Sequence, residues 1–192
     1  MKKIILPIVL LAVMAASAVA HAASPTQTVE THVNKLLAVL RDHSENKASK
    51  EEAIRAISSS LFDFTELSRF TLGRNWRKFD AQQQKTFVVL FRKLLESVYM
   101  DRLLQYKDQK VVMEKETALS ANRAEVMTNV VAAGGNIPMN YRMKHEDGAW
   151  KVYDLVIENV SLVRNYRTQF SSLLAKNSPA QLLDILRDKV KA

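Results

Sequence analysis

Residues 111–157 read VVMEKETALSANRAEVMTNVVAAGGNIPMNYRMKHEDGAWKVYDLVI, and this stretch decides the fold. Apolar and polar residues alternate along it, which is typical of strands that bury one face. The turn signals Gly134-Gly135-Asn136 and Glu146-Asp147-Gly148 divide it into shorter runs. We therefore predict an antiparallel meander with one apolar face and one polar face. Four strands are expected, at residues 111–116, 124–133, 137–144 and 150–157.

On both sides of this stretch the apolar period becomes helical. Ser24-Pro25 predicts the start of a first helix, and Ser49 with Glu52 forms a capping pattern for a second. Asp63 and Glu66 predict a short third helix that Gly73 ends. Asp80 and Gln83 cap a long fourth helix with a wide aromatic face, and two helices follow the strands. The sequence thus predicts an α+β fold: a curved four-stranded antiparallel sheet packed against N- and C-terminal helices.

The N-terminus predicts a secretory signal peptide. Met1-Lys2-Lys3 is a positive n-region, residues 4–19 are mostly apolar, and Ala20-His21-Ala22 is a small-x-small cleavage site. The apolar run falls short of the roughly 20 residues that a membrane span needs. We expect cleavage near Ala22, export to the periplasm, and a mature chain of one domain at residues 23–192.

Composition excludes several classes of chemistry. The chain has 192 residues and no cysteine, so a disulfide scaffold, a thiol nucleophile and a cysteine zinc site are all excluded. The remaining histidines match no metal motif, and no catalytic-triad or phosphate-loop pattern occurs. Asp154 lies inside an apolar strand, where it is either a catalytic base or, as we favour, a structural hydrogen-bonding acid. No catalytic or metal residues are predicted beyond that alternative.

The formal net charge is +8, and part of it is concentrated. Four basic residues cluster between the third and fourth predicted helices: Arg69, Arg74, Arg77 and Lys78. The predicted leader argues against nucleic acid as the partner, which leaves an anionic membrane surface, an acidic protein or a merely solvated face. The apolar faces also allow two interpretations. They fill one another in a closed core, or they enclose a cavity for an apolar ligand.

Two segments resemble a known family. Residues 62–77, FDFTELSRFTLGRNWR, and residues 150–162, WKVYDLVIENVSL, are similar to the MlaC family of toluene-tolerance Ttg2-type periplasmic proteins. The most specific features are Leu72-Gly73 with Trp76, and the tryptophan, tyrosine-aspartate and valine-serine positions of the second segment. The resemblance covers nearly all of the predicted mature chain. It implies an α+β fold that encloses a lipid-tail cavity.

The resemblance also implies a function. Members are soluble phospholipid carriers that shuttle lipid between an inner-membrane ABC transporter with an MCE-domain subunit and an outer-membrane lipoprotein–porin complex. That activity maintains outer-membrane lipid asymmetry, needs no cofactor other than the bound cargo, and involves no catalysis. Two alternatives stay open: an envelope adaptor with a filled core, and an NTF2-like enzyme that uses Asp154.

Given this resemblance, inward faces supply the candidate lipid-binding residues. They are Phe87, Leu90, Phe91, Leu94 and Val98 on the long helix, Val130, Met139, Tyr141 and Val152 on the strands, and Val156, Val160, Val163 and Tyr166 beyond them. Arg69 and Arg74 are the candidates for contact with a phosphate headgroup.

Overall fold

The computed structural model describes residues 23–106, 109–132 and 135–191, so the predicted leader lies outside the described residues. Helices precede and follow a run of strands, as predicted. The elements are α1 (Pro25–Arg41), α2 (Lys47–Leu61), α3 (Phe64–Leu72), the 3-10 helix η1 (Gly73–Lys78), α4 (Ala81–Leu104), β1 (Lys110–Ser120), β2 (Arg123–Ala132), β3 (Gly135–Glu146), β4 (Ala149–Ile157), β5 (Val160–Ser161), α5 (Leu162–Leu174) and α6 (Pro179–Lys189).

The strands form one antiparallel sheet in the order β1-β2-β3-β4-β5, with the long strand β1 at one edge. The fold class is confirmed, but the prediction of four strands was wrong by one. Glu158 and Asn159 both adopt positive φ, which reverses the chain so that Val160 and Ser161 pair with the end of β4. A two-residue strand carries no alternation, so no periodicity signals it.

A β-bulge interrupts the pairing of β3 with β4. Met143 lies opposite Val152, and Arg142 lies opposite Asp154, so Tyr153 is an extra residue. Because side chains opposite one another point to the same face, Val152 shares the apolar face with Met143. Asp154 shares the polar face with Arg142. The bulge therefore changes which face the later residues of β4 occupy.

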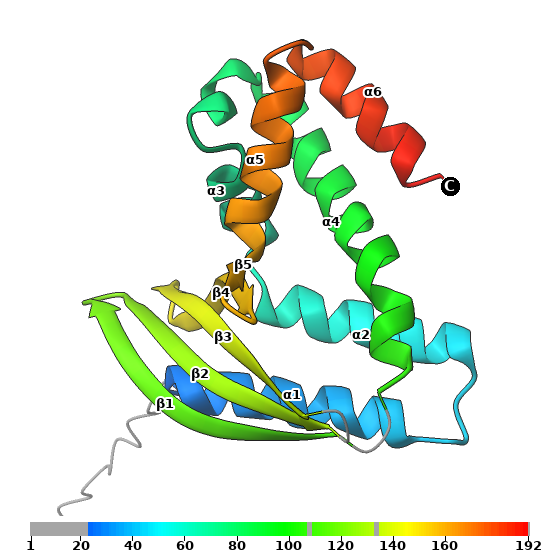
Figure 1. Ribbon diagram of the computed structural model, residues 1–192, viewed down its shortest axis with the longest axis vertical. Helices are drawn as coiled ribbons and strands as arrows, with labels where there is room; N and C mark the ends of the chain where they lie inside the picture. The colour runs from blue at the N-terminus through cyan, green and yellow to red at the C-terminus, as the bar shows by residue number, and fades with distance from the viewer. Residues whose placement is uncertain (1–22, 107–108, 133–134, 192) are drawn as a thin grey trace, which may run out of the picture.

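The apolar residues form two main clusters. The first cluster joins the helices α3, α4, α5 and α6, which we call the helical half, and it is centred on Phe87, Phe91 and Leu182. In the sheet half, the apolar face of the sheet packs against α1 and α2 around Val29, Val126 and Met143 (Figure 1). A smaller third cluster joins α1, α2 and the end of α4. Within the described residues, Phe62 is the one side chain that packs against both main clusters.

The helix starts follow local capping chemistry. Ser24, Asp63 and Asp80 accept hydrogen bonds from the backbone N–H three residues on, as predicted. The predicted start of α2 was wrong: the N-cap is Asn46, whose side chain accepts from the N–H of Ser49. Asn46 and Ser49 are both favourable N-cap residues, and a start at Asn46 makes α2 about one turn longer than a start at Ser49.

Gly73 ends α3 at φ 55° and ψ −125°. The predicted stop is confirmed, although this ψ is outside the left-handed helical region. Glycine adopts this backbone without strain, whereas a residue with a Cβ does not. The described residues contain no helix that is both long and apolar enough to cross a membrane.

Candidate functional site

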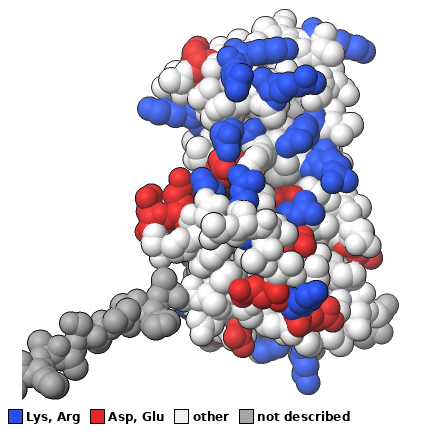
Figure 2. Space-filling view, turned by 90° about the vertical axis from the view of Figure 1, so that its left-hand side faces the viewer, with Lys and Arg blue, Asp and Glu red and all other residues white. Residues whose placement is uncertain are grey.

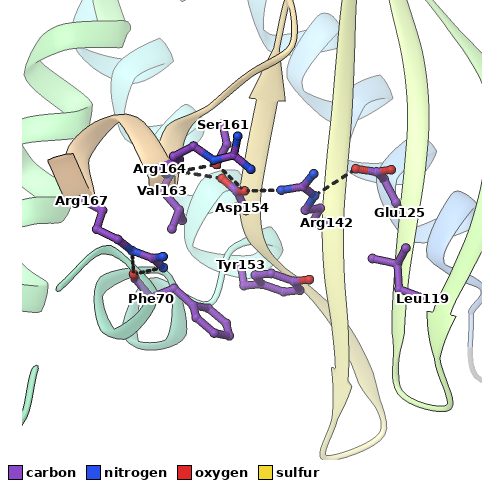
Figure 3. A pocket seen from close by; sticks show the side chains of 10 residues that line it. All are labelled: Phe70, Leu119, Glu125, Arg142, Tyr153, Asp154, Ser161, Val163, Arg164 and Arg167. Atoms are coloured by element: carbon purple, nitrogen blue, oxygen red, sulfur yellow. Dashed lines mark hydrogen bonds and ion pairs between the residues drawn. The ribbon is translucent and has the colours of Figure 1, made fainter. Parts of the chain in front are cut away.

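A pocket of about 360 Å³ opens where β4 meets the start of α5 (Figure 3). It lies on the polar face of the sheet, and α3 closes its far side. Its lining combines three arginines with two acids and two aromatic rings. The residues are Phe70, Leu119, Glu125, Arg142, Tyr153, Asp154, Ser161, Val163, Arg164 and Arg167.

Asp154 is the buried centre of this pocket, only 3% exposed. Its Oδ1 accepts the backbone N–H of Val163 at 3.0 Å, and its Oδ2 accepts the Ser161 hydroxyl at 2.7 Å. Oδ2 also accepts Arg142 Nη1 at 3.1 Å. The carboxylate therefore fixes the first turn of α5 to the sheet. Both oxygens of this buried carboxylate accept hydrogen bonds from the protein, which supports a structural role for this residue.

Arg142 links Asp154 to a second acid on the polar face. Its Nε donates to Glu125 Oε1 at 3.0 Å. Bulge and register explain the arrangement, because Glu125 lies opposite Arg142 in the β2–β3 pair and Asp154 lies opposite it in the β3–β4 pair. Two carboxylates thus compensate the charge of one arginine.

Among the residues that the structure describes, the other cations near the pocket form no ion pair with an acid. Arg167 donates through Nε to the Phe70 carbonyl at 2.9 Å, so it caps the C-terminal end of α3. Within the described part of the chain, the Arg164 guanidinium makes no hydrogen bond or ion pair. Arg123 lies 5.5 Å from the ring centroids of both Phe70 and Tyr153. Partial burial raises the pKa of the Tyr153 phenol, against the opposing effect of Arg123.

This pocket suits the binding of an anion. Among the described residues, the Arg164 guanidinium in its lining has no partner, and the pocket also contains the rings of Phe70 and Tyr153. Guanidinium groups bind carboxylate and phosphate oxygens well. Within residues 23–106, 109–132 and 135–191, no group of three or more histidine or acidic side chains is placed to hold a metal ion.

The headgroup candidates lie close by on α3 and η1. Arg69 is exposed and pairs with the buried Glu66, at 2.6 Å between Nη2 and Oε1. The hydrogen bond from Arg69 lowers the pKa of the Glu66 carboxyl, although burial opposes it. Arg74 is exposed on η1. Figure 2 shows that Lys and Arg gather on the upper part of this face, with the acids mostly below.

The predicted tail-contacting residues divide between the two clusters. Those on α4 and α5 that are buried belong to the helical half: Phe87, Leu90, Phe91, Leu94, Val163 and Tyr166. Burial raises the pKa of Tyr166 to about 12. Tyr141 and Val152 are buried in the sheet half, and Met139 packs against them. Val130 is buried on the same sheet face, because it lies opposite Ile137.

Three predicted positions lie elsewhere. Val98 and Val160 are 39% and 59% exposed, so the expectation that they face inward was wrong. Val98 is exposed although Leu95 and Met100, on either side of it in α4, are both buried. Val156 is buried on the opposite sheet face from Tyr141, since the bulge puts it opposite Asn140.

The pocket-lining arginines Arg142, Arg164 and Arg167 were not predicted as site residues. One sequence signal for the pocket exists, because Val152 and Leu155 are apolar residues three positions apart, a spacing that a strict period of two does not place on one face. That break in period indicates the bulge, and hence the polar pocket beside it.

The α+β architecture of this chain is shared with a solved structure. A phospholipid-binding protein from Ralstonia solanacearum, solved in complex with a phospholipid, has the same fold. The TM-score is 0.81 at 23% identity, over 88% of this chain and 98% of that one. The family model described as MlaC protein matches residues 30–188. The chain therefore belongs to the MlaC family, which confirms the resemblance seen in the sequence.

Two curated relatives agree with this assignment. The toluene tolerance protein Ttg2D of Pseudomonas putida is 26% identical over 162 residues, which is 81% of this chain and 75% of that protein. The intermembrane phospholipid transport system binding protein MlaC of Haemophilus influenzae is 30% identical over 110 residues. That match spans 55% of this chain and about half of the relative, 51%.

Proposed function

We propose that this chain is a phospholipid-binding transport protein of the Mla system, with residues 23–192 as one lipid-binding domain in the periplasm. Family membership supports the proposal, as do the names of the two curated relatives. The fold shared with a phospholipid complex supports it further. The carrier exchanges lipid with an inner-membrane ABC transporter and an outer-membrane lipoprotein–porin complex.

The observation that carries the proposal is the separation of the two apolar clusters. A domain of this size usually forms one contiguous core. Here the apolar face of the sheet and the apolar face of α4 belong to different clusters, with Phe62 packed against both. In this proposal, the acyl chains of the bound lipid lie between the two clusters.

The acyl chains in this proposal contact the sheet near Met139 and the α4 stripe near Leu94. Tyr141 supports an apolar surrounding there: its hydroxyl donates to the thioether of Met139 at 3.2 Å, a weak acceptor. Burial raises the pKa of this phenol far above its ordinary value. Methionine side chains adapt to ligands of varied shape, which suits acyl chains of different length.

The energetics suit a carrier. Each buried methylene contributes about 0.8 kcal/mol, so two acyl chains gain more than about 20 kcal/mol in total. A membrane offers the tails nearly the same gain, and the net transfer free energy therefore lies near zero. Loading and release both become possible without any catalytic group. The engaged state of Asp154 supports the absence of an enzymatic role.

The test is solvent extraction and lipid mass spectrometry of protein purified without added lipid. We expect diacyl phospholipid near one equivalent or more per chain. A lipid-free protein with native circular dichroism would overturn the carrier function and favour the adaptor.

Tryptophan substitutions locate the tails. Met139→Trp and Leu94→Trp add volume on the two sides of the proposed site, so each should reduce bound lipid or select shorter chains. Val112→Trp is the matched control, because Val112 is 47% exposed on the same sheet. If Met139→Trp and Leu94→Trp fold and bind the same amount and chain length of lipid as Val112→Trp, the acyl chains lie elsewhere.

A further inference from the structure

Two stretches of the helical half carry positive charge and no acid. Residues 67–79 contain Arg69, Arg74, Arg77 and Lys78 without an aspartate or glutamate. Residues 159–183 contain Arg164, Arg167 and Lys176, again without an acid. The two stretches are adjacent, because Arg167 bonds the Phe70 carbonyl and contacts Gly73.

These charges are largely uncompensated. Within the described residues, the side chains of Arg74, Arg77, Lys78 and Arg164 form no ion pair. We use the name basic surface for Arg69, Arg74, Arg77, Lys78, Arg164 and Arg167. Figure 2 shows that Lys and Arg gather on the upper part of that face, and two residues of the basic surface, Arg164 and Arg167, also line the pocket of Figure 3.

The shape of this region favours a protein partner over a membrane. A surface that binds lipid headgroups usually adds apolar side chains that protrude into the bilayer. Phe70 and Tyr153 instead lie half-buried inside the pocket, with Arg123 over both rings. A concave site with arginines above aromatic rings fits a side chain that projects from another protein.

We propose that the basic surface and its pocket form a docking site for an acidic segment of a protein partner. One carboxylate enters the pocket beside Arg164, and neighbouring carboxylates pair with Arg74 and Arg77. This inference rests on the proposed function in one respect: the exchange of lipid with membrane complexes gives the protein a reason to dock. Positive charge around the pocket also speeds encounter with an acidic partner at low salt.

The test measures the binding of fluorescein-labelled hexaglutamate by fluorescence anisotropy, with hexalysine as the charge control. Arg164→Glu should weaken hexaglutamate binding about tenfold, because it removes one cation of the pocket and adds a repelling charge. Lys35→Glu makes the same charge change at an exposed position on α1 and should weaken binding less than about twofold. Amide shifts in NMR spectra should cluster around the pocket. Arg164→Gln serves if the glutamate variant fails to fold.

Three outcomes would overturn the docking site. Equal losses in Arg164→Glu and Lys35→Glu would show an effect of net charge alone. Absence of hexaglutamate binding to the wild-type protein would remove the site. Flotation with vesicles of equal parts phosphatidylglycerol and phosphatidylcholine, lost in Arg164→Glu, would assign the surface to membranes.

Lipid content measured on the same samples keeps this inference apart from the proposed function. If Arg164→Glu binds hexaglutamate normally while lipid is present, docking fails and the carrier function stands. If the wild-type protein holds no lipid but binds the peptide, the carrier function fails and the docking site stands.

Discussion

The helical half and the sheet half of the molecule stabilise their cores in different ways. In the helical half, the rings of Phe87, Phe91, Tyr166 and Phe170 interlock at centroid distances of 5.0–5.7 Å. In the sheet half, aliphatic and methionine side chains pack against α1, and Met143 is fully buried. Aromatic edge-to-face contacts require a specific geometry, whereas methionine adapts. The helical half is thus the rigid frame, and the sheet half is the side better able to adjust to a ligand.

The two halves also differ in how they treat charge. On the sheet, Arg142 and Lys144 pair with nearby acids. On α3, η1 and α5, most cations lack such a partner. Charge on the sheet therefore maintains structure, while charge on the helical half remains available for another molecule.

The largest expected change in the free energy of unfolding comes from substitutions in the cores of the helical half and the sheet half. Phe91→Ala removes a fully buried ring that contacts three others, and should lower the free energy of unfolding by about 4 kcal/mol. Met143→Ala should cost about 2–3 kcal/mol, because the surrounding side chains adjust more easily. Urea unfolding followed by circular dichroism measures both. Equal costs would remove the contrast between a rigid and an adaptable core.

The next effect concerns the link between the halves. Asp154→Asn weakens the ion pair with Arg142 and leaves the hydrogen bonds to α5 with a poorer acceptor, so we expect a loss of about 2–3 kcal/mol. Glu125→Gln is the control, since it affects one contact of Arg142, and should cost about 1 kcal/mol. Thermal unfolding of both variants tests this. A loss in Asp154→Asn no larger than in the control would mean that Asp154 does not hold α5 to the sheet.

Gly73→Ala tests the junction of α3 with η1. At φ 55° and ψ −125° an alanine is strained, and its Cβ would lie 3.4 Å from Arg167 Nε. We expect a loss of about 1–2 kcal/mol. Thr65→Ala, at an exposed position of α3, should stay within about 0.5 kcal/mol of the wild-type protein. Chemical denaturation measures the free energy of unfolding of both variants. A Gly73→Ala variant as stable as Thr65→Ala would contradict the strain expected at Gly73.

The smallest effect depends on pH. The pKa of Glu66 is lowered in the folded protein by the hydrogen bond from Arg69, so its ionised form stabilises the fold above the ordinary value of 4.5. That stability is lost as the pH falls from 4.5 through the folded-state pKa. Arg69→Gln should lower stability at pH 7 by about 1 kcal/mol and by less at low pH. Unfolding measured across this range checks the sign, and a pH-independent difference would contradict it.

The sequence predicts the architecture well where the signals are local and periodic. Alternation located the four long strands, and Ser24, Asp63 and Asp80 located three helix starts. The two-residue strand β5 was missed, because its cause is a backbone reversal at Glu158 and Asn159. Periodicity also placed Val98 inside, since it reports the face of a helix but not whether a neighbouring element covers each position on that face.

The candidate site was harder to predict than the fold. The pocket at Asp154 combines residues from β1 to β5, α3 and α5, and depends on the extra residue in β4. A strict period of two assigns Val152, Asp154 and Val156 to one face. The bulge separates Val152 from the other two, and so it hides the pocket from periodicity. Arg164 and Arg167 lie on α5, and only the apolar face of that helix was considered in predicting the site from the sequence.

The edge strand β1 has a consequence for how the protein behaves in a crowded solution. An exposed strand of this length is a template on which other chains can add and aggregate. Two register irregularities interrupt β1, Lys110 and Lys115 place charge along it, and the start of α1 binds Glu116 through the backbone and hydroxyl of Thr26. Each feature discourages strand addition between copies. The sheet can thus remain open at one edge without offering other chains a regular template.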